Sequence, residues 1–227
     1  MKLIALLPMK GNSERIPNKN LKDFCGRPLF HRITESLLNS RYINKVVIDT
    51  DSIRIAKNAR ENFGDKVQII NRPPNIQGDF VSMNTIIGFD LQKLNQNIHF
   101  LQTHSTNPLL STDTINRAIE NYFNMIERKI YDSLFSVTRF QTRLYWQNGV
   151  PVNHDPNELI RTQDLPVVYE ENSNFYIFSR DSFQNNGGKR IGKKPYLYEI
   201  DKIEAIDIDE PDDFIIAEQL YKLKNNE

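Results

Sequence analysis

The sequence predicts an α/β fold: a mostly parallel, Rossmann-like sheet with helices on both faces, forming three layers. Two observations carry this prediction. Short apolar runs typical of buried strands recur along the 227 residues, and stretches of helical periodicity separate most of them. Strands that alternate with helices in this way are usually parallel, because each helix carries the chain back across the sheet. The length suits one domain, so we expect residues 1–227 to form a single unit.

These patterns predict strands and helices at definite places. The expected strands lie at 3–7, 46–48, 67–70, 98–102, 133–138, 174–178 and 205–208. The expected helices lie at 28–39, from about 52 to 63, at 82–94, 115–126 and 210–222. The first strand is apolar at every position and closes at Pro8, as in a strand buried on both faces. Asp51 or Thr50 could cap the second helix.

The helix at 115–126 has the clearest periodicity. Its apolar positions follow the spacing i, i+3, i+4, i+7, i+8 and i+11, at Ile115, Ala118, Ile119, Tyr122, Phe123 and Ile126. The helix at 28–39 begins with Pro28, which suits a first helical turn, and places Leu29, Ile33 and Leu37 on one face. Both helices therefore have an apolar side that can pack on the sheet.

The regular pattern loosens in the second half of the chain. Between about 140 and 175 the polarity is mixed and prolines occur at 151, 156 and 166. We expect this stretch to leave the core as an arm within the single domain. Tyr145 and Trp146 could pack in a dimer interface there, or they could cover the core.

Composition excludes several classes of protein. Lysine plus arginine equals aspartate plus glutamate at 29 each, so nothing indicates a nucleic-acid binder. Cys25 is the single cysteine, which rules out an intrachain disulfide. The apolar run at the start is too short for a signal peptide or a membrane span, and no later run is longer. We expect a cytoplasmic protein that does not bind membranes.

Polar loops follow the expected strands where a ligand would bind. In open α/β sheets, ligands bind beyond the carboxyl ends of the strands. This rule selects the loops at 9–20, 49–51, 71–82, 103–108 and 207–209, which hold most of the unusual polar residues.

The loop at 9–20 has the residue types that a triphosphate needs. Lys10, Arg15 and Lys19 could supply positive charge, and small residues at 11–13 could bring backbone N–H groups close to phosphate oxygens. The loop matches neither the Walker A pattern nor G-x-G-x-x-G. A solvated surface loop is the alternative, but its place directly after the first buried strand favours phosphate binding.

Two aspartates near the end of the chain could hold a metal ion. Asp207 and Asp209 stand at i and i+2 of an expected strand, so their side chains would point the same way. Paired carboxylates repel unless a cation holds them, and oxygen ligands suit Mg²⁺. Asp209 could instead cap the following helix, although capping leaves Asp207 unexplained.

The loop after the first strand resembles the signature of acylneuraminate cytidylyltransferases, which is close to P-A-R-G-G-S-K-G-I-P-x-K-N. Lys10 falls on its first arginine, and the lysine after the serine is replaced by Glu14, with Arg15 one place later. Further segments resemble the family in the same order, at 26–29, 48–51, 72–74, 78–82, 102–109, 161–166, 171–172 and 207–214. The resemblance covers nearly the whole chain.

The resemblance implies a fold, a reaction and a set of site residues. The fold would be of the nucleotide-diphospho-sugar transferase type. The reaction would transfer CMP from CTP to the anomeric hydroxyl of a sialic-acid-like, acidic nine-carbon sugar, with Mg²⁺ as cofactor. Catalytic roles would fall to Lys10, Arg15, Lys19 and Asp209, and metal binding to Asp207 and Asp209. The expected nucleotide-binding residues are Lys10, Gly11, Asn12, Ser13, Asn20, Arg72 and Ser82. The expected sugar-binding residues are Gln102, Thr103, His104, Gln163 and Tyr169.

Other readings stay open at the level of sequence. Transfer to Kdo or to a sugar phosphate is one alternative, and a non-catalytic sugar-nucleotide-binding domain is another. Kdo enzymes have a carboxylate after the fourth strand, whereas this chain has Gln-Thr-His-Ser at 102–105. His104 could act as a base, although a lone histidine is more often structural. Members of the family are commonly homodimers, and the arm at 140–175 would then reach toward the partner's site.

Overall fold

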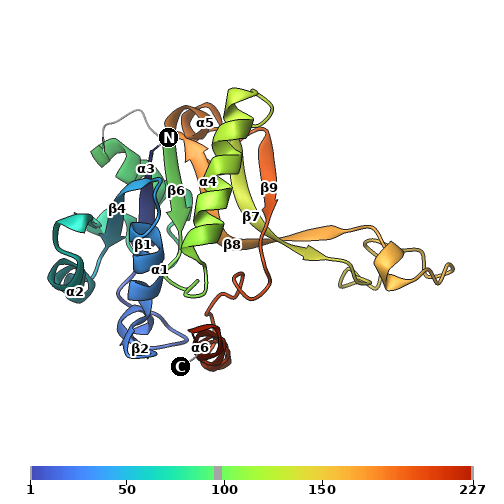
Figure 1. Ribbon diagram of the computed structural model, residues 1–227, viewed down its shortest axis with the longest axis horizontal. Coiled ribbons are helices and arrows are strands. Elements are labelled where there is room, and N and C mark those ends of the chain that lie inside the picture. The colour runs from blue at the N-terminus through green and yellow to red at the C-terminus, as the bar shows by residue number, and fades with distance from the viewer. Residues whose placement is uncertain (1, 95–98, 226–227) are drawn as a thin grey trace.

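A seven-stranded sheet forms the centre of the protein in a computed structural model that describes residues 2–94 and 99–225 (Figure 1). The strand order is β5-β4-β1-β6-β8-β7-β9. The strands are β1 Leu3–Met9, β4 Ile43–Thr50, β5 Val67–Asn71, β6 His99–Thr103, β7 Ser133–Phe140, β8 Val168–Ser179 and β9 Pro195–Glu199. A separate small hairpin pairs β2 Asp23–Phe24 with β3 Arg27–Pro28.

Most strand pairs are parallel, as predicted. Strand β1 runs parallel to β4 and β6, β4 to β5, and β7 to β9. Strand β8 is antiparallel to both β6 and β7, which makes the sheet mixed at that side. The helices are α1 Leu29–Leu38, α2 Ile53–Phe63, α3 Met83–Leu94, α4 Thr112–Glu127, α5 Arg180–Asn185 and α6 Pro211–Asn225. Short 3-10 turns lie at Lys19–Leu21, Gly64–Lys66, Pro74–Ile76 and Thr162–Asp164.

Two apolar layers hold helices against opposite faces of the sheet. Along β1, Leu3, Ala5 and Leu7 join the layer beneath α1, α2 and α4, and Ile4 and Leu6 join the layer that α3 and α5 cover. This alternation follows the two-residue period of a strand. It explains why the run at 3–7 is apolar throughout, and it confirms the three-layer fold.

Two predictions of local structure were wrong, and two elements were not predicted. The segment at 205–208 is not a strand; it crosses the carboxyl edge of the sheet, where Ile208 N donates to Thr106 O at 3.0 Å. The cap of α2 is Ser52, whose hydroxyl accepts from Ile55 N at 3.3 Å, rather than Asp51 or Thr50. Helix α5 and strand β9 were not predicted, because each is short and has little periodicity.

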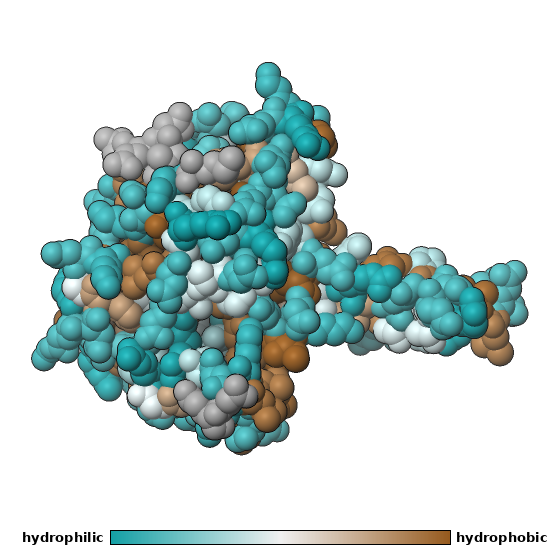
Figure 2. Space-filling view, in the orientation of Figure 1, coloured by the Kyte–Doolittle hydropathy of each residue, from teal (hydrophilic) through white to brown (hydrophobic). Residues whose placement is uncertain are grey.

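A ribbon projects from the body of the molecule near the stretch at 140–175, and we call it the arm. Strands β7 and β8 continue beyond the sheet as a ribbon that ends in loops away from the body of the molecule (Figure 1). Where the ribbon leaves the sheet, the pairing register shifts between Phe135 and Val137, and Ser173 adopts a positive φ of 58°. Apolar residues lie among polar ones along the arm (Figure 2). Tyr145 and Trp146 are exposed there, so they do not cover the core.

The helices have ordinary globular dimensions. Over residues 2–94 and 99–225, no helix combines the length and apolar character that crossing a membrane requires.

Candidate active site

A cleft of about 390 Å³ opens at the carboxyl ends of β1, β5 and β6. It lies where the loop rule placed it. The lining residues are Pro8, Met9, Lys10, Ser13, Glu14, Arg15, Lys19, Asn20, Arg72, Gly78, Asp79, Val81, Met83, Ile86, His104, Ser105, Thr106 and Asp209. The structure therefore brings together residues from four loops that are far apart in sequence, with Met83 and Ile86 of α3.

Gly11 allows the loop after β1 to pass close to the start of α2. Its backbone N–H donates to Asp51 Oδ1 at 2.6 Å. A Cβ at this position would lie 2.7 Å from Ser52 Cβ, which is closer than carbon atoms approach without a shift of the backbone. The close approach accounts for glycine here, and it fixes the path of the loop toward Lys10.

Asn20 joins two of the cleft's loops. Its side-chain amide donates to Lys10 O at 2.8 Å, and its Oδ1 accepts from Ser105 Oγ at 2.6 Å. The side chain is buried, so these bonds are shielded from competition by water. Asn20 was predicted to bind nucleotide; in the structure it also holds the loop after β1 against the loop after β6.

Each cation of the loop faces a carboxylate. Lys10 forms an ion pair with Asp79 across the cleft. Arg15 lies 2.8 Å from an Asp209 oxygen and 2.9 Å from Glu210, and these acids raise the pKa of Arg15.

Lys19 is the least exposed of the three cations. It donates to Ile208 O at 2.6 Å and lies 3.7 Å from Asp209. Burial lowers the pKa of Lys19, and Asp209 opposes that effect. The cleft thus concentrates positive charge that is balanced internally.

Asp207 and Asp209 both lie near Lys19, although they do not stand on a strand. Asp207 Oδ1 is buried and has no hydrogen-bond donor within the described residues. Burial raises the pKa of Asp207, and the charge of Asp209 adds to the rise. At the start of α6, Asp213 accepts hydrogen bonds from the backbone N–H groups of Asp209 and Glu210, so Asp209 is free of that capping role.

Arg72 reaches the cleft from a buried position. Its guanidinium donates to Asp49, and Asp49 lies beside the buried carboxyl of Asp90. Burial raises the pKa of Asp90 to about 9, and the charge of Asp49 adds to the rise. Asp90 therefore keeps its proton at neutral pH, so the negative charge of Asp49 balances the positive charge of Arg72.

The loop after β6 supplies the residues that were expected to bind sugar. Gln102 is fully buried; its amide donates to Thr103 O at 2.9 Å and to His104 Nε2 at 3.2 Å. Burial lowers the pKa of His104 to about 3, with Arg190 and Lys19 adding to the effect, so the imidazole is neutral. Because His104 Nε2 accepts from Gln102, its lone pair is not available to act as a base in this arrangement.

A family model described as cytidylyltransferase matches residues 4–226, which is nearly the entire chain. The chain belongs to the cytidylyltransferase family.

Curated relatives give the same picture. The chain is 28% identical to the pseudaminic acid cytidylyltransferase of Campylobacter jejuni, over 99% of this chain and 98% of the relative. It is 25% identical to the CMP-N,N'-diacetyllegionaminic acid synthase of Legionella pneumophila, over 98% and 97% of the two chains. It is also 32% identical to N-acylneuraminate cytidylyltransferase A of Danio rerio, over 95% of this chain but only 50% of that longer protein.

Solved structures share the fold of this cytidylyltransferase. A CMP:2-keto-3-deoxy-manno-octonic acid synthetase, determined in complex with CTP, superposes with a TM-score of 0.69 at 13% identity, covering 99% of this chain and 100% of that one. A 4-diphosphocytidyl-2C-methyl-D-erythritol synthase from Anaerococcus prevotii superposes with a TM-score of 0.68 at 11% identity, covering 97% and 96%. At such identities the likeness concerns the fold, and it confirms the nucleotidyltransferase-type architecture.

Several predicted site residues of this cytidylyltransferase lie outside the cleft lining. Ser82 accepts from Thr85 N at 3.2 Å at the start of α3, and its neighbours in sequence line the cleft instead. Thr103 is buried and donates to Asn174 O at 2.6 Å. Gln163 and Tyr169 lie on the arm, away from the cleft of their own chain. Asn12 is exposed on the loop between Gly11 and Ser13 without lining the cleft.

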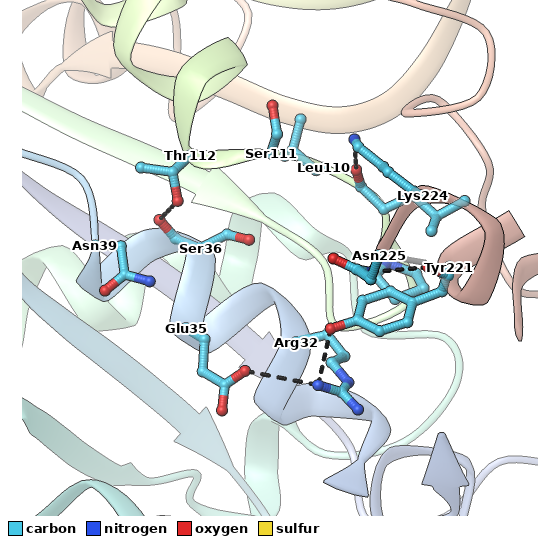
Figure 3. Close-up of a pocket in the computed structure, with 12 residues that line it drawn as sticks. Arg32, Glu35, Ser36, Asn39, Leu110, Ser111, Thr112, Tyr221, Lys224 and Asn225 are labelled. Carbon is cyan, nitrogen blue, oxygen red and sulfur yellow. Dashed lines mark hydrogen bonds and ion pairs between the residues drawn. The ribbon is translucent and has the colours of Figure 1, made fainter. Parts of the chain in front are cut away.

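A second hollow, of about 270 Å³, lies between α1, α6 and the start of α4 (Figure 3). Two of its polar side chains already have partners: Arg32 donates to the Tyr221 hydroxyl at 2.9 Å, and Lys224 lies 3.1 Å from Glu204, which is outside the lining. It shares no lining residue with the cleft, and we assign it no part in the chemistry of the cytidylyltransferase.

Proposed function

We propose that this cytidylyltransferase transfers CMP from CTP to the anomeric hydroxyl of an acidic nine-carbon sugar, a sialic-acid-like nonulosonate, and releases pyrophosphate. The observation that carries the proposal is the convergence of Lys10, Arg15 and Lys19 on one cleft with Asp209. Similarity over nearly the full length to enzymes named for pseudaminic and legionaminic acids supports this class of sugar.

The reaction forms one bond and breaks one bond at the α-phosphorus of CTP. The anomeric hydroxyl oxygen attacks the α-phosphorus and gives its proton to solvent, and the bond from that phosphorus to the bridging oxygen of the β-phosphate breaks. Lys10, Arg15 and Lys19 would neutralise the charge that develops on the departing pyrophosphate. Asn20 and Ser105 would keep these cations in register with the loop after β6, because their hydrogen bond joins the two loops.

The ion pairs within the cleft suit an exchange in which CTP replaces the protein's own acids as the partner of these cations. Lys10, Arg15, Asp79 and Asp209 have roughly half-exposed side chains, and exposed ion pairs contribute little to stability. A triphosphate offers stronger, multiply charged acceptors for the same cations. Binding of CTP would therefore draw Lys10 from Asp79 and Arg15 from Asp209.

Asp207 and Asp209 would hold Mg²⁺ once the triphosphate has drawn Arg15 away from Asp209. The unpartnered, buried Asp207 Oδ1 fits this role, because such an oxygen needs a cation or a donor. No group of three metal-binding side chains comes together in the part of the chain that the structure describes. Two carboxylates still suit Mg²⁺, which keeps several waters and binds substrate phosphates. When bound, the ion would polarise the α-phosphate.

We also propose that the protein acts as a homodimer, in the cytoplasm, where a cysteine outside any disulfide stays reduced. Exposed apolar residues on a projecting arm support self-association, at Tyr145, Trp146, Val150, Leu159, Ile160 and Tyr169. An arm that reaches a second copy could bring Gln163 and Tyr169 to the partner's cleft. This would give a role to two predicted sugar-binding residues that lie far from their own cleft.

Pyrophosphate release tests the proposed reaction. The protein is incubated with CTP, Mg²⁺ and each of a panel of sugars: N-acetylneuraminic, pseudaminic and legionaminic acids, and Kdo. We expect release with at least one nine-carbon acid, no release without sugar, and much slower release when UTP replaces CTP. Release with Kdo alone would overturn the choice of sugar, and equal rates with UTP would overturn the choice of nucleotide.

A further inference from the structure

Arg190 lies in the loop between α5 and β9, and both its side chain and its backbone make specific contacts with neighbouring residues. The guanidinium carbon lies 3.6 Å from the centre of the Tyr176 ring, and Nη1 donates to Gln102 Oε1 at 2.6 Å. The backbone N–H of Arg190 donates to Asn84 Oδ1 at 3.2 Å. Tyr176 and Gln102 are fully buried, so the guanidinium rests on a fixed aromatic and amide surface.

This cation has no carboxylate within ion-pair distance among the described residues. The ion pairs of residues 2–94 and 99–225 include Lys10, Arg15, Lys19 and Arg72 but not Arg190. Burial lowers the pKa of Arg190, and the charge of Glu171 opposes that effect from farther away; a guanidinium keeps its charge at any physiological pH. A partly buried charge without an acid in direct contact is costly in the free protein, and a bound anion would relieve that cost.

Arg190 adjoins the cleft along two paths. Gln102, which accepts its hydrogen bond, donates in turn to His104, and His104 lines the cleft. Asn84, which holds its backbone, follows Met83, another lining residue. The charges of both Arg190 and Lys19 act on His104, so the histidine has one cation on the loop after β1 and another on the loop before β9.

We propose that Arg190 binds the carboxylate of the acidic sugar and thereby selects this class of acceptor. The inference rests on the proposed function and adds to it the residue that recognises the acid group. In a 2-keto sugar acid, the anomeric carbon carries both the carboxylate and the hydroxyl that attacks. A planar guanidinium binds a carboxylate through two parallel hydrogen bonds, which fixes direction as well as position. Holding the carboxylate at Arg190 would therefore turn the anomeric hydroxyl toward the phosphate end of the cleft.

The two Arg190 contacts suit this role. Stacking on Tyr176 leaves the edge of the guanidinium available for hydrogen bonds, because the ring occupies only one face. Gln102 uses one N–H of the five that an arginine side chain offers. Gln102 was predicted to orient the sugar; in this proposal it acts as a positioning residue that orients Arg190.

The test compares kinetic constants of Arg190→Gln and Arg190→Lys with those of Lys189→Met, a matched control at the exposed neighbouring cation. The acceptor is the best nine-carbon acid and, separately, its uncharged carboxamide. For R190Q we expect KM for the acid to rise about tenfold to a hundredfold, as for loss of a charge-assisted hydrogen bond, while KM for CTP stays the same. The carboxamide should show little difference between R190Q and the wild type. R190K should recover part of the loss, and K189M should match the wild type.

The outcomes separate this inference from the proposed function. If the wild type transfers CMP to no acidic sugar, the proposed function fails and this inference fails with it. If the wild type is active but R190Q has the same KM for the acid, only the role of Arg190 is overturned. If R190Q loses affinity equally for acid, carboxamide and CTP, or melts at a much lower temperature, Arg190 is a structural cover for Tyr176. Full recovery in R190K would show that charge matters but that two-point binding does not.

Discussion

The two ends of the cleft treat positive charge differently. At the phosphate end, Lys10, Arg15 and Lys19 each face an acid of the same chain. At the other end, Arg190, which adjoins the cleft without lining it, faces an aromatic ring and an amide, with no acid within ion-pair distance in the described part of the chain. Exposed ion pairs are weak, so the cations of the phosphate end can exchange their acids for a triphosphate when it binds. Arg190 has no close acid to release, so its charge is compensated at short range only when an anion binds.

The largest effect is expected where the acids of the phosphate end are removed. Asp207→Asn and Asp209→Asn should each slow pyrophosphate release about a hundredfold to a thousandfold, as for loss of a group that stabilises transition-state charge. The Mg²⁺ concentration needed for half-maximal rate should also rise. The measurement is pyrophosphate release against Mg²⁺, with thermal melting as the folding control. If both variants keep near-normal rates and an unchanged Mg²⁺ requirement, the metal is held elsewhere and the two ends differ less than we propose.

A smaller loss is expected at the most exposed cation of that end. Arg15→Ala should lower kcat/KM for CTP about tenfold, because one charge-assisted interaction with phosphate is lost. Glu14→Ala is the matched control, since Glu14 is the exposed neighbour that replaces the lysine of the family signature. It should change kcat/KM little. Equal, small losses in both variants would mean that Arg15 is a surface residue and that Lys10 and Lys19 carry the phosphate.

A substitution on the arm tests whether a second copy contributes residues to the sugar-binding part of the cleft. Trp146→Asp places a charge at an exposed apolar position of the arm. We expect the mass from light scattering to fall from dimer toward monomer at micromolar concentration, with KM for the sugar rising several-fold more than KM for CTP. Lys66→Asp is the control and should stay dimeric, because Lys66 lies just before β5, at the edge of the sheet opposite to β9. A fully active wild-type monomer would remove the proposed assembly.

The last comparison concerns stability rather than turnover, at Arg72, the buried cation that does have an acid. The pKa of Asp90 is raised from 3.8 to about 9, so the folded state keeps a proton that the unfolded state releases above about pH 4. The folded state then binds more protons, and the free energy of unfolding falls as pH rises from about 4 to about 9. The side chain of Asp90→Asn does not titrate. The melting temperature of this variant should therefore rise relative to that of the wild type as the pH increases across this range.

Exposed Asp65→Asn provides the comparison for that measurement, because it changes the same chemical group outside the pair. Its difference from the wild type should vary little over the same range. A pH-independent difference for Asp90→Asn would show that Asp90 is ionised in the folded protein. Arg72 would then have two carboxylates against one guanidinium.

Much of the fold follows from local sequence. The run at 3–7 and the face formed by Ile115, Ala118 and Tyr122 are local patterns, and each became the expected strand or helix. The segment at 205–208 also looks like a strand, but its backbone bonds Thr106, about a hundred residues away in sequence. Strand β9 was not predicted because it pairs with β7, where Pro195 lies opposite Ser133, and a pairing so remote in sequence leaves no local signal.

The candidate site likewise has parts that the local sequence reveals and parts that depend on residues distant in sequence. The loop at 9–20 was recognisable because its cations and small residues are consecutive, and the family assignment that it suggested is confirmed. The site roles themselves stay predictions. Arg190 was missed because nothing in a loop rich in glycine and lysine distinguishes one cation from its neighbours. Only the stacking on Tyr176 and the bond to Gln102 single it out, and these partners lie 14 and 88 positions away.

Strand β8 belongs both to the sheet and to the arm, and Ser173 marks the division between them. From Ser173 to Val168 the strand extends about 17 Å, at roughly 3.3 Å for each residue. A rotation of about 10° at that bend displaces Val168 by about 3 Å, and it displaces the more distant tip by more. Ser173 is five residues from Phe178 in the packed core, so the backbone direction at this one position strongly influences where the exposed Trp146 of the arm lies. We therefore expect a substitution at Ser173 to change the direction of the arm while leaving the side chains at its tip unchanged.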